Sequence, residues 1–252
     1  MLIKRIGVFA YVFLIVVGIL LSQEYHGITG LIQTPNAEID SAGTFRGNIS
    51  WVDEAMLPVM SDFGDGLPFS APCYTIGLSA WKWLQLSYTG VVVKIHPNGD
   101  KTKPLGYYNQ DRHVNVKFIP LFEGKWWPAI AVGMDDIGRL DFIKRGDNHN
   151  NHFQNIYIAG SKTFVIKGHE LGVHLAYRYY ATNRNRDRRG LAGGLTYRPA
   201  FFKQRRGIVE WDGIGVNAGV DVLLWKRLYA QVALIHGTGF TGGLGYHYRI
   251  KY

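Results

Sequence analysis

The chain has 252 residues, a formal net charge of +9 and 14% aromatic residues. Its single cysteine, Cys73, excludes an intrachain disulfide. The basic residues are scattered along the chain, without the concentrated patch that indicates nucleic-acid binding. After residue 22 no apolar run is long enough for a membrane helix, so the remaining length suits one large all-β domain.

The first residues predict a secretory signal peptide. Lys4 and Arg5 precede an uninterrupted apolar run from Ile6 to Leu21, which is followed by the polar residues Ser22 and Gln23. The run is shorter than the ~20 residues that a spanning helix needs, so a retained membrane anchor is the less favoured alternative. We therefore expect cleavage of the leader and export of the mature chain.

Three regions are expected: a signal peptide at 1–22, a periplasmic N-terminal segment or plug at 23–42, and an outer-membrane β-barrel at 43–252. In the third region, polar and apolar residues alternate at period two, as in a strand with one apolar face. The predicted strands are 43–53, 73–81, 83–94, 112–121, 127–136, 153–165, 169–180, 189–198, 206–212, 214–225, 227–236 and 239–252. Twelve is an even number, as a single-chain bacterial barrel requires, although the pattern after 198 leaves ten or fourteen open.

The connections between these strands favour a barrel over a soluble sandwich. Long polar links alternate with short ones in the first half of the chain. The long links are 54–72, 95–111 and 137–152, and the short links are Lys82, 122–126 and 166–168. Long outer loops alternating with tight periplasmic turns are typical of outer-membrane proteins. We therefore expect an all-β, transmembrane, antiparallel up-and-down barrel located in the cell outer membrane.

Polar and charged residues occupy the face of the predicted strands opposite to the apolar one. A charge in hydrocarbon costs several kcal/mol, so these residues are expected to face the lumen. Such a lumen could guide a polar polymer, or an ion-pair network could simply fill a closed barrel. The lumen-facing candidates are Arg46, Lys117, Glu170, His174, Arg178, Arg198, Glu210, Asp221 and Arg249.

Aromatic residues gather at the ends of the predicted strands, where amphipathic rings settle at the level of the lipid headgroups. We expect them to form interfacial girdles, with stacking on sugar rings as the alternative. The candidates are Trp51, Trp81, Trp83, Trp126, Trp127, Tyr179, Tyr180, Trp211, Trp225 and Tyr229.

Two segments suggest contacts with other components of the envelope. Arg184, Arg186, Arg188 and Arg189 fall in a predicted outer loop, where guanidinium groups could pair with lipopolysaccharide phosphates; a solvated basic tip is the alternative. At the other end, Tyr248, Ile250 and Tyr252 lie on the apolar face of the last strand. This pattern resembles the C-terminal signal that the barrel-assembly machinery reads in outer-membrane proteins.

Catalysis has little support in the sequence. It contains no Gly-x-Ser-x-Gly elbow, no His-Glu-x-x-His helix and no phosphate-binding glycine loop. We expect no catalytic residue, no metal and no cofactor. A barrel lipase or protease, whose residues would come together only on folding, is a distant third alternative.

Three motifs resemble the YjbH/GfcD-type family of exopolysaccharide-associated outer-membrane proteins. They are the GLIQTPNA segment at 30–37, the WPAIAVGMDDIG strand at 127–138, and VEWDG at 209–213 followed by NAG at 217–219. The family members considered are longer, so this chain resembles a short, single-barrel member. The resemblance implies a non-catalytic outer-membrane barrel associated with the production or export of exopolysaccharide, with polysaccharide-export proteins as partners. The alternative is a structural barrel or a diffusion channel for small solutes.

Overall fold

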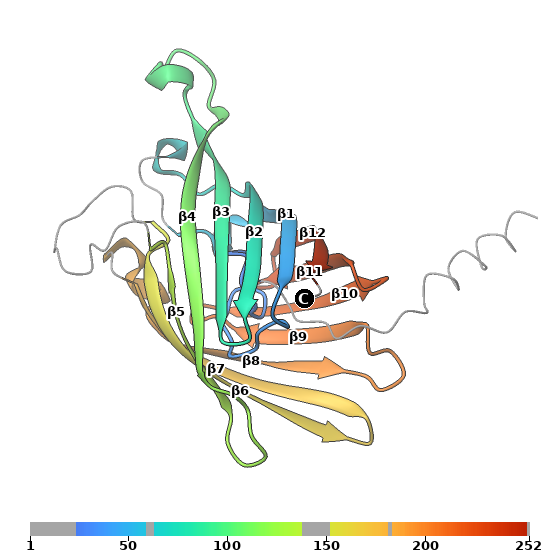
Figure 1. The fold of residues 1–252 in the computed structure, drawn as a ribbon. Helices are drawn as coiled ribbons and strands as arrows, with labels where there is room; N and C mark the ends of the chain where they lie inside the picture. Colours follow the sequence, from blue (N-terminus) through green and yellow to red (C-terminus); the bar gives the residue numbers. More distant parts are fainter. Residues whose placement is uncertain (1–23, 59–62, 138–151, 181–182, 251–252) are drawn as a thin grey trace, which may run out of the picture.

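The computed structural model describes residues 24–58, 63–137, 152–180 and 183–250. The predicted signal peptide and Tyr252 lie outside these residues. Twelve strands form one antiparallel sheet that closes on itself, because each strand pairs with its neighbours in the chain and the first pairs with the last (Figure 1). The predicted twelve-stranded barrel is therefore confirmed. The strands are β1 (Thr44–Val52), β2 (Ala71–Trp81), β3 (Leu84–Ile95), β4 (Gly106–Leu121), β5 (Ala129–Asp135), β6 (Asn155–Ile166), β7 (His169–Tyr180), β8 (Gly190–Arg198), β9 (Arg205–Trp211), β10 (Val216–Leu224), β11 (Leu228–Ile235) and β12 (Gly239–Arg249).

The strand that departs most from the expected bounds is β4, which begins at Gly106 instead of residue 112. Its additional residues pair with the end of β3, where Gly106 lies opposite Ile95. The strands β3 and β4 therefore form a hairpin that reaches beyond the rest of the barrel (Figure 1). The added residues 107–110 are all exposed, so they lack the alternation that marks a half-buried strand.

The two ends of the barrel differ in their connections. One end, here called the loop end, carries the connections 53–70, 96–105, 136–154, 181–189, 212–215 and 236–238. The other, the turn end, carries 82–83, 122–128, 167–168, 199–204 and 225–227. Thr44 pairs with Arg249, so the first and last strands meet at the turn end. The first four loop-end connections are longer than any at the turn end, which is the asymmetry expected of an up-and-down outer-membrane barrel, whereas 212–215 and 236–238 are short.

The outer surface is apolar because successive side chains of each strand point to opposite faces. On β7, the outward residues Leu171 to Tyr179 are exposed at every second position, and the alternate residues His174 to Tyr180 are buried. The girdle prediction is therefore wrong for Tyr180 and Tyr229, which are buried. Both occupy the inward phase of their strands. The described residues include no helix that is both long enough and apolar enough to cross a membrane.

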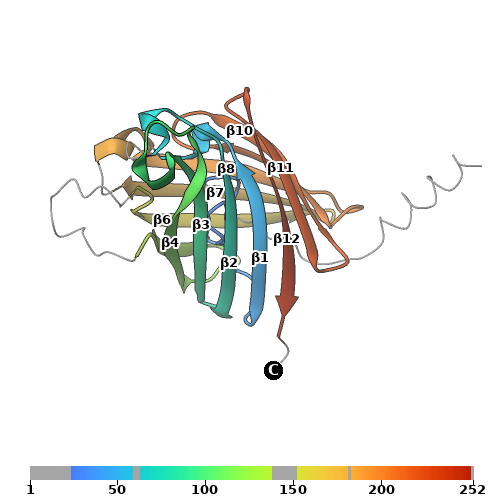
Figure 2. The same cartoon turned by 90° about the horizontal axis from the view of Figure 1, so that it is seen from above.

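The N-terminal segment, residues 24–42, lies inside the ring of strands (Figures 1 and 2). Every residue from Glu24 to Ala37 is buried. Some of its apolar side chains form a core with loop-end residues: Leu31 and Ile32 belong to the same buried cluster as Met56 and Phe153. The segment thus replaces water along part of the lumen.

Candidate functional site in the filled lumen

A tight turn in the N-terminal segment presents its backbone to the barrel wall. Gly30 and Pro35 form an antiparallel bridge, and the amide of Leu31 donates to the carbonyl of Thr34 over 2.9 Å. The amides between these positions have no partner within the turn and must find acceptors elsewhere, because a buried amide without one is costly. The GLIQTPNA motif therefore encodes a compact turn with outward-pointing donors.

Glu210, on β9, accepts those donors. Its carboxylate lies 3.0 Å from the amide of Ile32, 2.9 Å from that of Gln33 and 3.1 Å from that of Thr34. The side-chain amide of Asn217 on β10 donates to the same carboxylate over 2.8 Å. Three of these four donors come from the segment, and together the four compensate the burial of the carboxylate's charge.

Two basic residues of the wall bind carbonyl groups of the segment. Lys117 on β4 donates to the backbone carbonyl of Thr29, to its hydroxyl over 2.7 Å and to the carbonyl of Glu38 over 3.1 Å. Arg178 on β7 donates to the carbonyl of Gln33 over 3.2 Å and to that of Asp212. Both cations therefore hold the segment through its backbone.

Two acidic residues of the segment pair with arginines near the turn end. Glu38 lies 3.1 Å from Arg206 on β9, which also contacts Asp221 on β10 over 2.9 Å. Asp40 pairs with the guanidinium of Arg46 on β1, which is fully buried. In the low dielectric of the lumen, each pair stabilises a charge that would otherwise be expensive to bury.

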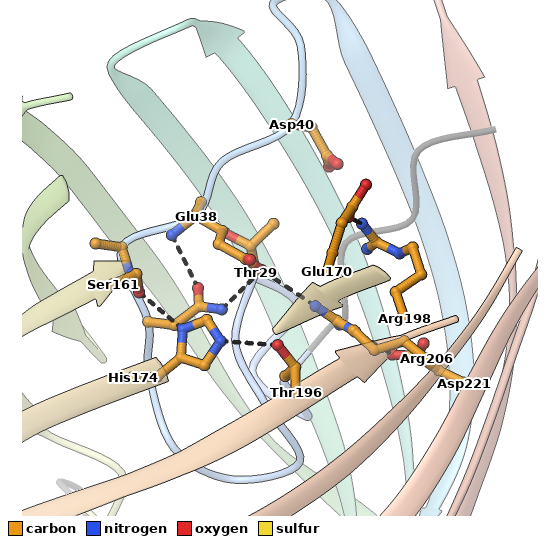
Figure 3. A network of polar contacts seen from close by, with 12 residues as sticks. Thr29, Glu38, Asp40, Ser161, Glu170, His174, Thr196, Arg198, Arg206 and Asp221 are labelled. Atoms are coloured by element: carbon orange, nitrogen blue, oxygen red, sulfur yellow. Dashed lines mark hydrogen bonds and ion pairs between the residues drawn. The ribbon is translucent and has the colours of Figure 1, made fainter. Parts of the chain in front are cut away.

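A chain of hydroxyl and imidazole groups runs along the inner face of three neighbouring strands (Figure 3). His174 on β7 lies 2.9 Å from Ser161 on β6 and 3.1 Å from Thr196 on β8. The hydroxyl of Ser161 also accepts the amide of Ala37 over 2.8 Å. Ser161 is buried and contacts both His174 and the amide of Ala37, so it links the segment to this chain of groups. In the described part of the chain, no group of three or more His, Cys, Asp or Glu residues is arranged to hold a metal ion.

The structure brings most of the expected lumen residues into one network. Arg46, Lys117, His174, Arg178, Glu210 and Asp221 are all buried and lie against the segment or its partners. Glu170 and Arg198 form an ion pair that is partly exposed near the turn end. Arg249 faces the same side as Thr44 but is exposed at the rim.

Sequence reasoning missed several members of the network. Arg206 shares the inward phase of Glu210 on β9, and His113 shares that of Lys117 on β4, so the alternation itself could have found both. Glu38 and Asp40 gave no such signal, because they lie outside the strands, where no alternation indicates the direction of a side chain.

The arginines of the 181–189 connection have different environments. Arg188 donates to the backbone carbonyls of Ala55, Met56 and Leu57 and thereby joins two loops. Arg189 donates to the carbonyl of Tyr180 over 2.8 Å.

The remaining two arginines of this connection belong to a short 3-10 helix, η5 (Asn183–Arg188). Arg184 lies within it, and Arg186 is exposed. Of the expected assembly signal, Tyr248 is exposed opposite Phe45, and Ile250 is exposed beyond the end of β12.

Comparisons with known proteins give one family and several structures. The family model YjbH, described as exopolysaccharide biosynthesis protein YbjH, matches residues 22–187. No curated protein sequence gives a significant match. Outer membrane phospholipase A from Escherichia coli is 11% identical, with 84% of this chain and 98% of that chain covered and a TM-score of 0.39. The β domain of the Bordetella autotransporter BrkA is 14% identical, with 84% and 100% covered and a TM-score of 0.35. An outer-membrane channel from Pseudomonas putida F1 is 9% identical, with 87% and 100% covered and a TM-score of 0.36.

Proposed function

Because the chain belongs to the YjbH family of exopolysaccharide biosynthesis proteins, we propose that it is a non-catalytic outer-membrane barrel that takes part in the production or export of extracellular polysaccharide. The family match confirms the resemblance carried by the motifs at 30–37 and 127–138. The turn end would face the periplasm and the loop end the cell exterior, as in bacterial barrels with short periplasmic turns.

The observation that carries this proposal is the contrast between the two faces of the barrel. The exterior presents apolar side chains such as Ile49, Leu175 and Val220, as a lipid-exposed surface requires. The interior presents hydroxyl, amide and ionisable groups at successive levels, from Gln85 near the turn end to Glu210 near the loop end. Sugars are rich in hydroxyl groups, which such a lining can bind through hydrogen bonds.

The N-terminal segment would act as a plug in this scheme. It occupies the lumen, and its contacts with the wall include hydrogen bonds and ion pairs, which can exchange with those of a polar polymer or water. Transport through the lumen would require the segment to move, whereas a role in assembling an export complex would leave it in place.

Contacts with the envelope complete the proposal. Of Arg186, Arg188 and Arg189, the exposed Arg186 is the best placed to meet lipopolysaccharide phosphates, since Arg188 and Arg189 bind backbone carbonyls. Tyr248, Ile250 and Tyr252 would form the signal for the barrel-assembly machinery, and polysaccharide-export proteins would be periplasmic partners.

Two measurements in the native host test the proposal. Fractionation should recover the mature chain with the outer membrane, in a form that requires detergent for extraction. Deletion of the gene should lower extracellular polysaccharide, and the wild-type gene on a plasmid should restore it. Recovery of the chain in the periplasmic fraction, or unchanged polysaccharide after deletion, would contradict it.

The second candidate is a structural barrel, and the filled lumen favours it. Six of the expected lumen residues are engaged with the segment or with its partners, so the network can serve stability alone. In that case, substitution of Arg178 by alanine would lower the stability of the barrel because it breaks a buried network, and polysaccharide output would not change.

A further inference from the structure

Three basic residues of the lumen wall lie in its turn-end half. Arg46, Lys117 and Arg206 lie near the turn ends of β1, β4 and β9. Asp135 and Glu210 lie near the loop ends of β5 and β9. All five side chains are buried. The turn-end half of the wall therefore presents three buried cations, of which Arg206 also pairs with Asp221 of the wall.

The N-terminal segment binds these cations through carboxylate and carbonyl groups. Glu38 pairs with Arg206, Asp40 pairs with Arg46, and the carbonyl of Glu38 accepts from Lys117. The Nε and Nη1 atoms of Arg46 are buried and have no hydrogen-bond partner among the described residues, so this guanidinium retains unused donors. The segment therefore leaves part of the hydrogen-bonding capacity of Arg46 unused.

A cavity of about 700 Å³ opens beside this cluster at the turn end. Glu38 and Asp40 form part of its lining, and His247, Lys226 and Arg249 form another part. Lys226 and Arg249 are exposed, so they are the first cations that a molecule meets at this mouth. Ligand pockets typically measure ~300–1,000 Å³, so the cavity can hold part of a small oligosaccharide.

We propose that the turn-end mouth is a binding site for polysaccharide that carries carboxylate groups, in which uronate-type sugars displace Glu38 and Asp40 from Arg206 and Arg46. This inference rests on the proposed function and names the substrate class of the lumen. Lys226 and Arg249 attract the polymer, and its carboxylates then take the place of the segment's own. The exchange conserves charge, because one buried carboxylate replaces another.

The test measures binding by calorimetry on the full mature chain in detergent. The probes are a hexamer of galacturonate and maltohexaose, a neutral hexamer of similar size. In the E38Q/D40N variant Arg206 and Arg46 lose the carboxylates that the segment supplies, so the galacturonate hexamer should bind about tenfold more tightly than to the wild type. Binding should weaken with added salt, and the affinity for maltohexaose should not change.

The matched control is E54Q/D187N, which removes the same charges from exposed positions at the loop end. It should bind both hexamers as the wild type does. Arg249→Gln in the otherwise wild-type chain should weaken galacturonate binding severalfold, which tests the site even where E38Q/D40N does not fold.

Equal galacturonate affinity in E38Q/D40N and E54Q/D187N would overturn the inference, as would equal affinity for the two hexamers or an Arg249→Gln variant that binds like the wild type. These outcomes are distinct from a failure of the proposed function. If deletion of the gene leaves extracellular polysaccharide unchanged while the binding results hold, the acidic-glycan site stands and its role in polysaccharide production falls.

Discussion

Glu210 binds the backbone amide of Gln33 over 2.9 Å, although the two residues are 177 positions apart. The contact joins two of the motifs that carry the family resemblance, the GLIQTPNA turn and the strand that contains Glu210. It also explains why a glutamate is useful there: a carboxylate can accept several donors at once, and three neighbouring amides of the turn point at it.

Replacing Glu210 with alanine should destabilise the barrel and release the turn. Three buried amides lose their acceptor, and each unsatisfied buried donor costs ~1–3 kcal/mol before relaxation or water entry reduces the sum. Thermal unfolding, followed by the gel shift between folded and unfolded barrel, should occur at a clearly lower temperature. Glu54→Ala, at an exposed loop position, is the control and should unfold like the wild type. Equal unfolding temperatures for both variants would show that the contact between Glu210 and the turn does not stabilise the barrel.

A valine at Gly77 should open the lumen to ions. A Cβ atom at this inward position would lie 2.8 Å from the carbonyl oxygen of Gly27, so the side chain collides with the N-terminal segment. We expect single-channel currents in planar bilayers that the wild type does not give.

The control for this variant is Gly47→Val. Gly47 lies on the neighbouring strand, where an added Cβ meets nothing within 4 Å. This variant should fold and remain closed. Currents of equal size from both variants, or from neither, would mean that displacement of the segment does not control conduction.

Arg188→Gln should loosen the 53–58 part of the first loop-end connection. The guanidinium donates to three consecutive carbonyls there, and glutamine cannot supply the same number of donors. Hydrogen exchange of the amides of Met56 and Leu57 should accelerate about tenfold. Arg186→Gln removes an equal charge from an exposed side chain and should leave these rates unchanged. If both variants show the same exchange rates, the loss of charge and not the loss of the Arg188 hydrogen bonds determines those rates.

The contact between His96 and Asp65 should depend on pH. The hydrogen bond that His96 donates to the Asp65 carboxylate, followed by the one that it donates to the carbonyl of Lys103, raises the pKa of His96 above its usual value. Protonated His96 therefore joins the two loops at lower pH, and the contact is lost as pH rises through the raised pKa. NMR titration of the imidazole should give a midpoint that falls in Asp65→Asn. An unchanged midpoint would show that the two side chains do not interact in solution.

Period-two alternation was sufficient to predict the twelve strands, because a barrel wall is apolar on one face and polar on the other. It failed where that contrast is absent. The start of β4 at Gly106 projects beyond the apolar belt, and Tyr180 and Tyr229 are aromatic residues on the inward face. A composition rule that assigns aromatic rings to the membrane interface cannot detect their direction.

The candidate site was predictable in part. The inward phase identified Arg178 and Glu210, but nothing in the sequence indicated what they bind. Their partners come from a segment without periodic pattern, and pairs such as Glu38 with Arg206 span most of the chain. Such pairings follow from closure of the barrel around the segment, which is a property of the whole fold.

The most direct test of the account compares extracellular polysaccharide in the deletion strain complemented with the wild type, with Arg178→Ala, or with Arg186→Ala as a matched exposed arginine. Each protein should be adjusted to the same amount of folded barrel in the outer membrane.

The account predicts that the wild type and Arg186→Ala restore polysaccharide equally and that Arg178→Ala restores clearly less, because the lumen takes part in the process. If Arg178→Ala restores polysaccharide as fully as the wild type does, the result would contradict a role for the lumen. If the deletion strain makes as much polysaccharide as the parent strain, the result would contradict the proposed function itself.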